Sequence, residues 1–285
     1  MQAPPVDRLS SLLERFRLQT QLSFHGTMCG LHRFDQSEGK GYLHLLRRGN
    51  LQVSHPGAEG LPTTLCLTEP TLLFYPRPFT HHFHNPPRDG SDLTCAELAF
   101  DSWQSHPIAR ALPPCVILPL RKVDGLGQAL ELLFAETASV RCGQRVLADR
   151  LFEVVLIQLL RWILDHPTEI CLSTGLLMGL SSPQLAPTLV AFHDAPHQTW
   201  PLERLAHIAG MSRTAFAVKF KQLVGQPPAQ YVADWRLTIA QARLCEGVPL
   251  KVLAAELGYS TQSALTRFFT ARLGVSPRRW LSQRD

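Results

Sequence analysis

A short sequence pattern that occurs twice near the carboxyl end constrains the fold more than any other feature of this chain. Each copy has an apolar segment with helical spacing, then a glycine, then a second helical run that ends near another glycine and a proline. The copies occupy residues 205–228 and 253–277, with Gly210 and Gly258 at equivalent central positions. Two copies of one helical motif are therefore predicted.

The pattern has a local physical explanation. Gly210 and Gly258 can adopt the positive φ that a sharp turn between two helices requires. Ser212 in the first copy, and Ser260 or Thr261 in the second, can cap the following helix through a hydroxyl group. The sequence therefore predicts a tandem helix-turn-helix. The expected apolar stripes of the second helices are Phe216 and Phe220 in the first copy and Leu265, Phe269 and Leu273 in the second.

The second helix of each copy also has a face that the apolar stripe does not use. This face carries Arg213, Thr214, Ala217, Val218 and Lys221 in the first copy and Gln262, Ser263, Thr266 and Arg267 in the second. In the major groove of DNA, Arg can pair with guanine and Gln with adenine, and small apolar groups can contact the thymine methyl. One such face alone is equally well explained as a solvated surface, whereas two matched faces indicate DNA recognition.

Positive charge is concentrated on the same segment. Residues 196–285 contain 12 Lys and Arg against 5 Asp and Glu, a net charge of +7. Residues 1–195 contain 16 against 18, a net charge of −2, and the two values account for the +5 of the whole chain. A basic segment of this kind is expected of a domain that binds phosphates, with an affinity that falls steeply with salt.

Residues 199–281 resemble the DNA-binding domain of the AraC/XylS family of bacterial transcription regulators. The resemblance rests on the runs Trp200 to Ala206, Gly210 to Arg213, Gly225 to Pro228, Trp235 to Leu237, Gly258 to Ser260 and Gly274 to Pro277. It implies two helix-turn-helix units joined by a long helix over residues 229–245. The resemblance also assigns contacts with the DNA groove. They are Thr214, Ala217 and Val218 in the first unit and Gln262, Ser263, Thr266 and Arg267 in the second. Because Ala217 and Val218 stand where many relatives have polar residues, we expect the first unit to read bases weakly.

The rest of the chain predicts a second domain. From Leu22 to Val116, short apolar segments alternate with Gly, Pro, Asn and Asp, which predicts strands of a small antiparallel β-barrel. Residues 126–164 have helical periodicity, and residues 168–187, rich in Ser, Thr, Gly and Pro, predict a linker. We therefore expect an α+β chain: a barrel with helices over 1–167, a linker over 168–187, and an all-α tandem helix-turn-helix domain over 188–285.

The first domain resembles, on the runs 46–51 and 72–81, the cupin-like sensor domain of one branch of AraC-type regulators. This resemblance implies that the barrel senses an effector, a small molecule or a redox signal that the sequence does not identify. It also implies that the helices over 126–164 form a homodimer. An intramolecular helix pair packed on the barrel explains the same sequence equally well.

Histidines in the first domain offer a metal site as an alternative. His82 and His84 lie on one side of a predicted strand, and His44 could face them from a neighbouring strand, which would suit imidazole coordination. No carboxylate stands with them at a recognisable spacing, and the histidine-rich signature of enzymatic cupins is absent. We therefore expect no metal and no cofactor.

Two cysteines are candidates for redox sensing. Cys142 is flanked by Arg141 and Arg145, whose positive charges would favour the thiolate, and Cys95 lies in a predicted strand. A buried, inert thiol is the alternative for each. The chain has seven cysteines and no C-x-x-C motif, which predicts reduced thiols rather than a disulfide framework.

Three function classes fit parts of the sequence. A transcription regulator is expected to bind double-stranded promoter DNA and, by family analogy, to activate through RNA polymerase. A cupin metalloenzyme fused to a DNA-binding module would need metal ligands that are absent. A DNA-repair methyl acceptor would need a four-cysteine zinc group, which the spacing of Cys29, Cys66, Cys95 and Cys115 does not provide. With no signal peptide and no apolar run of about eighteen residues, we expect a cytosolic, non-enzymatic regulator without a membrane partner.

Overall fold

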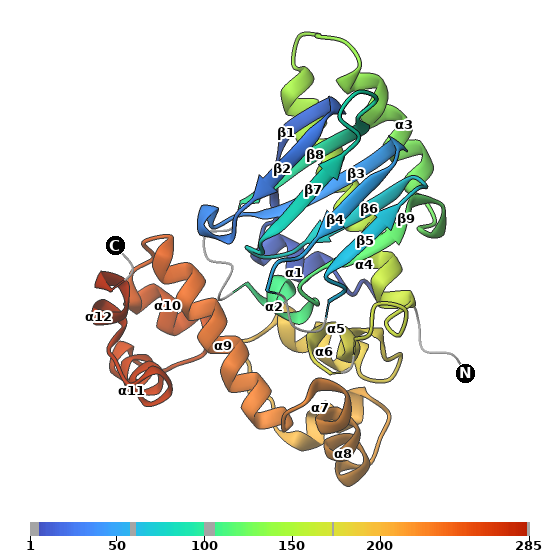
Figure 1. Ribbon diagram of the computed structural model, residues 1–285. Helices are drawn as coiled ribbons and strands as arrows, with labels where there is room; N and C mark the ends of the chain where they lie inside the picture. Colours follow the sequence, from blue (N-terminus) through green and yellow to red (C-terminus); the bar gives the residue numbers. More distant parts are fainter. Residues whose placement is uncertain (1–5, 58–60, 100–105, 173, 284–285) are drawn as a thin grey trace. The chain divides into compact units, whose positions relative to one another are not determined.

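The structure, a computed structural model, describes residues 6–57, 61–99, 106–172 and 174–283 (Figure 1). These residues belong to two compact units. The β unit comprises residues 17–100 and 108–172, and the helical unit comprises residues 1–16, 101–107 and 173–285. No helix among the described residues is long and apolar enough to cross a lipid bilayer.

The β unit contains two antiparallel sheets. A five-stranded sheet has the order β1-β8-β3-β6-β9, and a four-stranded sheet has the order β2-β7-β4-β5. The strands are β1 (Gln19–Met28), β2 (Gly30–Phe34), β3 (Gly41–Gly49), β4 (Leu51–Ser54), β5 (Thr64–Leu67), β6 (Thr71–Tyr75), β7 (His81–Asn85), β8 (Ser91–Ala99) and β9 (Val116–Pro119). Short helices η1 (Gln36–Glu38), α2 (Pro107–Ala111) and η2 (Leu120–Lys122) connect some of them.

The predicted antiparallel β fold is confirmed, with one correction to its shape. The sheets are open rather than closed into a barrel, because β1 and β9 end one sheet and β2 and β5 end the other, each with one hydrogen-bonded neighbour. The chain changes sheet between β1 and β2 at the single residue Cys29. Such abrupt changes of sheet produce a sandwich of two layers.

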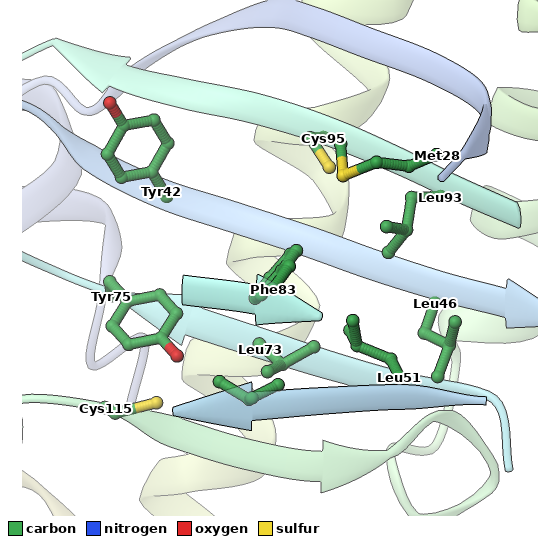
Figure 2. Close-up of a cluster of buried hydrophobic side chains, with 11 residues drawn as sticks. Met28, Tyr42, Leu46, Leu51, Leu73, Tyr75, Phe83, Leu93, Cys95 and Cys115 are labelled. Carbon is green, nitrogen blue, oxygen red and sulfur yellow. The ribbon is translucent and has the colours of Figure 1, made fainter. Parts of the chain in front are cut away.

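The core of the β unit lies between the two sheets. Tyr42 and Leu46 of β3 and Phe83 of β7 come from opposite sheets and are buried in the same cluster, into which the labelled side chains of Figure 2 point. Alternate residues of β3, such as Leu43 and Leu45, are also buried. Because successive strand residues point to opposite faces, the five-stranded sheet must be covered on both faces.

Helices α3 (Leu126–Thr137) and α4 (Gln144–Asp165) cover the outer face of this sheet (Figure 1). The side chain of Asp149 in α4 accepts a hydrogen bond from the backbone N–H of Leu22, at 2.6 Å, where the pairing of β1 with β8 is interrupted by a bulge. The hydroxyl group of Thr20 donates to the backbone carbonyl of Asp149, at 2.7 Å. Helix α4 therefore satisfies backbone and side-chain groups at the edge strand.

The helical unit is built around one long helix, α9. Its helices are α1 (Ser10–Arg15), α5 (Leu176–Ser181), α6 (Ala186–Asp194), α7 (Leu202–Ile208), α8 (Arg213–Val224), α9 (Pro228–Cys245), α10 (Leu250–Glu256), α11 (Gln262–Leu273) and α12 (Pro277–Ser282). The ring of Trp235 in α9 stacks on His193 of α6, with centroids 4.0 Å apart, and meets the edge of Phe16, which follows α1. The first helix of the chain therefore belongs to the helical unit.

The stretch expected to be a linker, residues 168–187, contains helix α5 and the start of α6. Gly179 in α5 lies so close to α6 and α8 that an added Cβ would be 2.8 Å from Leu189 and from Val224. The backbone N–H of Gly175 donates to the carbonyl of Leu223, at 2.9 Å. This stretch is packed because Gly allows a close helix approach that its turn-rich composition does not reveal.

Candidate nucleic-acid interface

Both helix-turn-helix units have the local geometry that their sequences predict. Gly210 and Gly258 adopt φ values of 64° and 76° between the two helices of each unit. The hydroxyl group of Ser212 accepts from the backbone N–H of Ala215 at 3.3 Å, and so caps α8. In the second unit the cap is Thr261, which accepts from the backbone N–H of Ala264 at 3.1 Å.

The capping residues set where α8 and α11 begin, and the buried residues of each helix determine which of its faces is exposed. Phe216 and Phe220 of α8, and Leu265 and Phe269 of α11, are buried. The residues predicted to contact DNA lie on the other sides of these helices. Seven of them are exposed, Arg213, Thr214, Val218, Lys221, Gln262, Ser263 and Arg267, and two are partly buried, Ala217 and Thr266.

One predicted DNA contact has a partner within the protein. The guanidinium of Arg213 lies 2.7 Å from the carboxylate of Glu203 in α7, and both side chains are exposed. The hydrogen bond from Arg213 lowers the pKa of the Glu203 carboxyl group. Exposed ion pairs contribute only about 0–1 kcal/mol, so a DNA phosphate can compete for Arg213, at reduced net gain.

Other exposed cations of the helical unit make no ion pair within the described part of the chain. Apart from Arg204, which donates hydrogen bonds to Thr199 and Gln198, they are Lys221, Lys251, Arg267, Arg278 and Arg279, from α8, α10, α11 and α12. Three of them, Lys251, Arg278 and Arg279, were not among the predicted contacts. The sequence signal for two of these was the adjacent pair Arg278 and Arg279, because Arg and Lys side chains are common donors to DNA phosphates.

Helix α5 lies beside the first helix-turn-helix unit, a contact that was not predicted from the sequence. A surface groove of about 910 Å³ is lined by Met178 and Ser181 of α5 and by Thr214 and Val218 of α8, among others. Lys219 of α8 donates to the side-chain carbonyl of Gln184, which follows α5. One flank of the α8 face is therefore bordered by α5.

The structure separates the three histidines considered as metal ligands. His44 is fully buried between the sheets, whereas His84 is exposed and His82 partly exposed on the outer face of the four-stranded sheet. The imidazole of His44 instead faces His81, with the two Nε2 atoms 3.0 Å apart. Within the described residues, no group of three or more His, Cys, Asp or Glu side chains is arranged to hold a metal ion.

The buried histidine pair is neutral. Burial lowers the pKa of His44 well below its usual value and that of His81 to about 3. The Nδ1–H of His81 donates to the carbonyl of Phe79 at 2.8 Å, so its Nε2 accepts a hydrogen bond from the Nε2–H of His44. The β unit therefore contains two imidazoles whose protonation would destabilise the folded state.

The two candidate redox cysteines differ in exposure. Cys95 is buried between the sheets, and burial raises the pKa of its thiol, which keeps it protonated and unreactive. Cys142 is exposed just before α4. All seven cysteines are free thiols.

The architecture defines a two-part protein, with a β sandwich and a tandem helix-turn-helix unit, and family comparisons agree with both parts. Residues 7–165 match the family described as Cupin, and residues 205–283 match the family described as Helix-turn-helix domain. The chain belongs to the AraC-type family of helix-turn-helix transcription regulators that carry an amino-terminal cupin domain.

Several known proteins are similar to this chain. A putative AraC-like transcription regulator of Streptomyces antibioticus is 33% identical over 169 residues, which are 58% of this chain and 55% of that protein. The RCS-specific transcriptional activator RclR of Escherichia coli K12 is 25% identical over 240 residues, 82% of this chain and 81% of its own length. A second putative AraC-like transcription regulator, from Streptomyces lividans, is 32% identical over 169 residues, and the chain spans about 55% of the length of each of these two Streptomyces relatives.

One solved structure is also similar to part of this chain. The DNA-binding domain of the global transcriptional factor AdpA, in complex with a target DNA, shares 28% identity over 34% of this chain and 89% of its own, with a TM-score of 0.31.

The buried imidazoles predict a pH dependence of stability. A His whose pKa is about 3 in the folded state and about 6.5 in the unfolded state binds fewer protons when folded, so stability falls as pH drops below about 6.5. For His81, the change from pH 6.5 to 5 should lower the free energy of unfolding by roughly 2 kcal/mol. Urea denaturation of the wild type at pH 7.5 and 5.0 should show this decrease in the free energy of unfolding. In His81→Gln the decrease should be smaller by about 2 kcal/mol. His84→Gln, on the exposed face, is the control, and an unchanged pH dependence in His81→Gln would contradict the assignment.

Proposed function

We propose that this protein is a transcription regulator that binds specific sequences in double-stranded promoter DNA, with α8 and α11 each entering a major groove. The observation that carries the proposal is the duplication of one capped, glycine-turned helix pair, each copy with an exposed face on its second helix. A single such face is common on protein surfaces. Two such faces on one structural unit are what a protein needs to enter successive major grooves on one side of a duplex.

The chemistry of the two faces assigns them different roles. On α11, Gln262 and Arg267 are exposed side chains that can form paired hydrogen bonds with adenine and guanine. On α8, Val218 is 63% exposed and Ala217 is partly buried. These two side chains offer only apolar contact to thymine methyl groups. We therefore assign base discrimination mainly to α11, and positioning on the duplex mainly to α8 with Lys221.

Replacement of Arg267 tests this assignment. A duplex selected by wild-type protein from a random-sequence library serves as the probe, and binding is measured by fluorescence anisotropy at several salt concentrations. Arg267→Ala should lose about 1–3 kcal/mol and should discriminate less at one base pair. Lys221→Ala, the matched comparison, should weaken binding to all sequences equally and reduce the salt slope by about 0.9. Equal losses of Arg267→Ala on the selected duplex and on a scrambled duplex would refute base reading by this residue.

We propose that the β unit receives the signal, a small molecule or an oxidant, that controls DNA binding. Cys142 is the better placed of the two candidate thiols for an oxidant, because it is exposed and lies between Arg141 and Arg145, whereas Cys95 is buried. Regulation is proposed to be activation through RNA polymerase, which rests on family analogy.

A reporter gene under a promoter that the protein controls distinguishes an oxidant from a small molecule. If the signal is oxidative, Cys142→Ser should abolish the response to added oxidant, because the reactive sulfur is gone. Cys171→Ser, which removes another exposed thiol, should respond as wild type does. An unchanged response in Cys142→Ser would eliminate this thiol as the sensor.

We also propose that the protein forms a homodimer through α3 and α4. The side chains that support this are apolar and exposed on these helices: Leu132 51%, Val146 64%, Leu147 41% and Val154 41%. Leu147 and Val154 are seven residues apart in α4, so they lie on one side of the helix, as in helix pairs that pack in parallel or antiparallel fashion. Burial of such side chains against a second copy would stabilise association.

Sedimentation measurements test the dimer. The double variant Leu147→Glu, Val154→Glu should raise the dimer dissociation constant by roughly tenfold or more, equivalent to about 1.4 kcal/mol, because it buries carboxylates in an apolar contact. Leu31→Glu on β2, where Leu31 is 48% exposed, is the control and should leave association unchanged. A wild-type protein that stays monomeric at high micromolar concentration would rule out the dimer.

A further inference from the structure

The two helix-turn-helix units are connected by more than helix α9. A loop of five residues, 195–199, precedes the first unit and runs beside α9 and the second unit. Arg236 in α9 donates from Nε to the carbonyl of Pro196 and from Nη2 to the carbonyl of Gln198, both at 2.8 Å. Hydrogen bonds from a charged, planar guanidinium are stronger and more directional than neutral ones. The loop is therefore held to α9 at two points.

The same loop touches the turn of the second unit. A Cβ added to Gly258 would lie 2.0 Å from the carbonyl oxygen of His197 and 2.8 Å from its carbonyl carbon. The backbone of the turn therefore lies directly against the backbone of the loop. Gly258 meets two requirements at once, a φ of 76° and an approach that no side chain would permit.

Ion pairs complete the attachment of the second unit to α9. Arg243 of α9 pairs with Glu256 of α10 at 3.0 Å, and Asp234 of α9 pairs with Arg272 of α11 at 2.5 Å. The side chain of Arg236 also lies near Tyr259, the residue after the turn glycine, with its guanidinium carbon 5.9 Å from the ring centroid. The segment that leads into the first unit is thus joined, through Arg236 and Gly258, to the elements that hold the second.

We infer that Arg236, the 195–199 loop and Gly258 form a brace that sets the distance and rotation between the two recognition helices, and so the number of base pairs between the two sequences they read. This inference rests on the proposed function. Each added base pair moves the second sequence by about 3.4 Å and rotates it by roughly a tenth of a turn. A protein whose two helix-turn-helix units are rigidly connected cannot bind both sequences after that change. If one helix alone connected the units, that helix could bend and both sequences could still be bound. Arg236 is therefore a positioning residue for specificity and does not itself read bases.

Selection from a random 40-base-pair duplex library with the full chain tests the brace. Three proteins are compared: wild type, Arg236→Lys and Arg204→Lys. Lysine keeps the charge but cannot bind two carbonyls with one planar group. Arg204 is the matched control, because it binds the same loop from α7, at the carbonyl of Thr199 (3.0 Å) and the side chain of Gln198 (2.6 Å), without reaching the second unit.

Wild type and Arg204→Lys should select two short sequences at one fixed spacing. Arg236→Lys should select the same two sequences at several spacings. For wild type, one base pair inserted between the sequences should weaken binding by about tenfold or more, the cost of one mismatched position. For Arg236→Lys that penalty should fall to about threefold or less.

The outcomes separate the brace from the proposed function. If Arg236→Lys keeps one spacing and the full insertion penalty, or changes the selected sequences instead of their spacing, the brace is refuted while DNA reading stands. If Arg204→Lys relaxes the spacing as much as Arg236→Lys does, the loop acts only through the stability of the first unit, and the brace is again refuted. If wild type enriches no sequence at all, the proposed function itself fails.

Discussion

The burial of helix α9 is the interaction on which the rest of the helical unit depends. Tyr231 near its start packs on Phe220 of α8, with ring centroids 5.5 Å apart, and Trp235 stacks on His193 of α6. Toward its end, Ile239 and Leu244 are buried where α10 and α12 contact α9. One helix therefore supplies apolar surface to both helix-turn-helix units, and neither unit could bury its own stripe as well alone.

The β unit depends on a similar double burial. The five-stranded sheet has one face against the four-stranded sheet and the other against α3 and α4, which explains why six consecutive residues of β3 are buried. A strand buried on both faces has no alternation of apolar and polar residues, and its apolar run does not tell which residue points inward. His44 and His81 are polar groups in that interior, where burial keeps them neutral by lowering their pKa values and where they form a hydrogen bond with each other.

Much of the recognition motif could be predicted because its determinants are local. A turn glycine, a capping hydroxyl group and an apolar stripe act within a few residues of one another, so Gly210, Ser212 and Phe216 could be assigned from spacing alone. The choice between Ser260 and Thr261 as the second cap could not, because both have hydroxyl groups and they differ by one residue in where α11 begins. The ion pair of Arg213 with Glu203 joins residues ten apart in different helices and left no signal in the helical pattern.

By itself the amino-acid sequence determined the two helix-turn-helix segments, the long helices over 126–164, the antiparallel β character of the first domain, the two matched helix faces and the concentration of positive charge. These follow from side-chain type and short-range spacing. Only the tertiary structure decided that the sheets stay open, that α1 and α5 belong to the helical unit, and that His44 meets His81 rather than His82 and His84. The same holds for the contact of Gly258 with His197. Such contacts join residues distant in the chain, and their geometry is set by how whole elements pack, which no local pattern records.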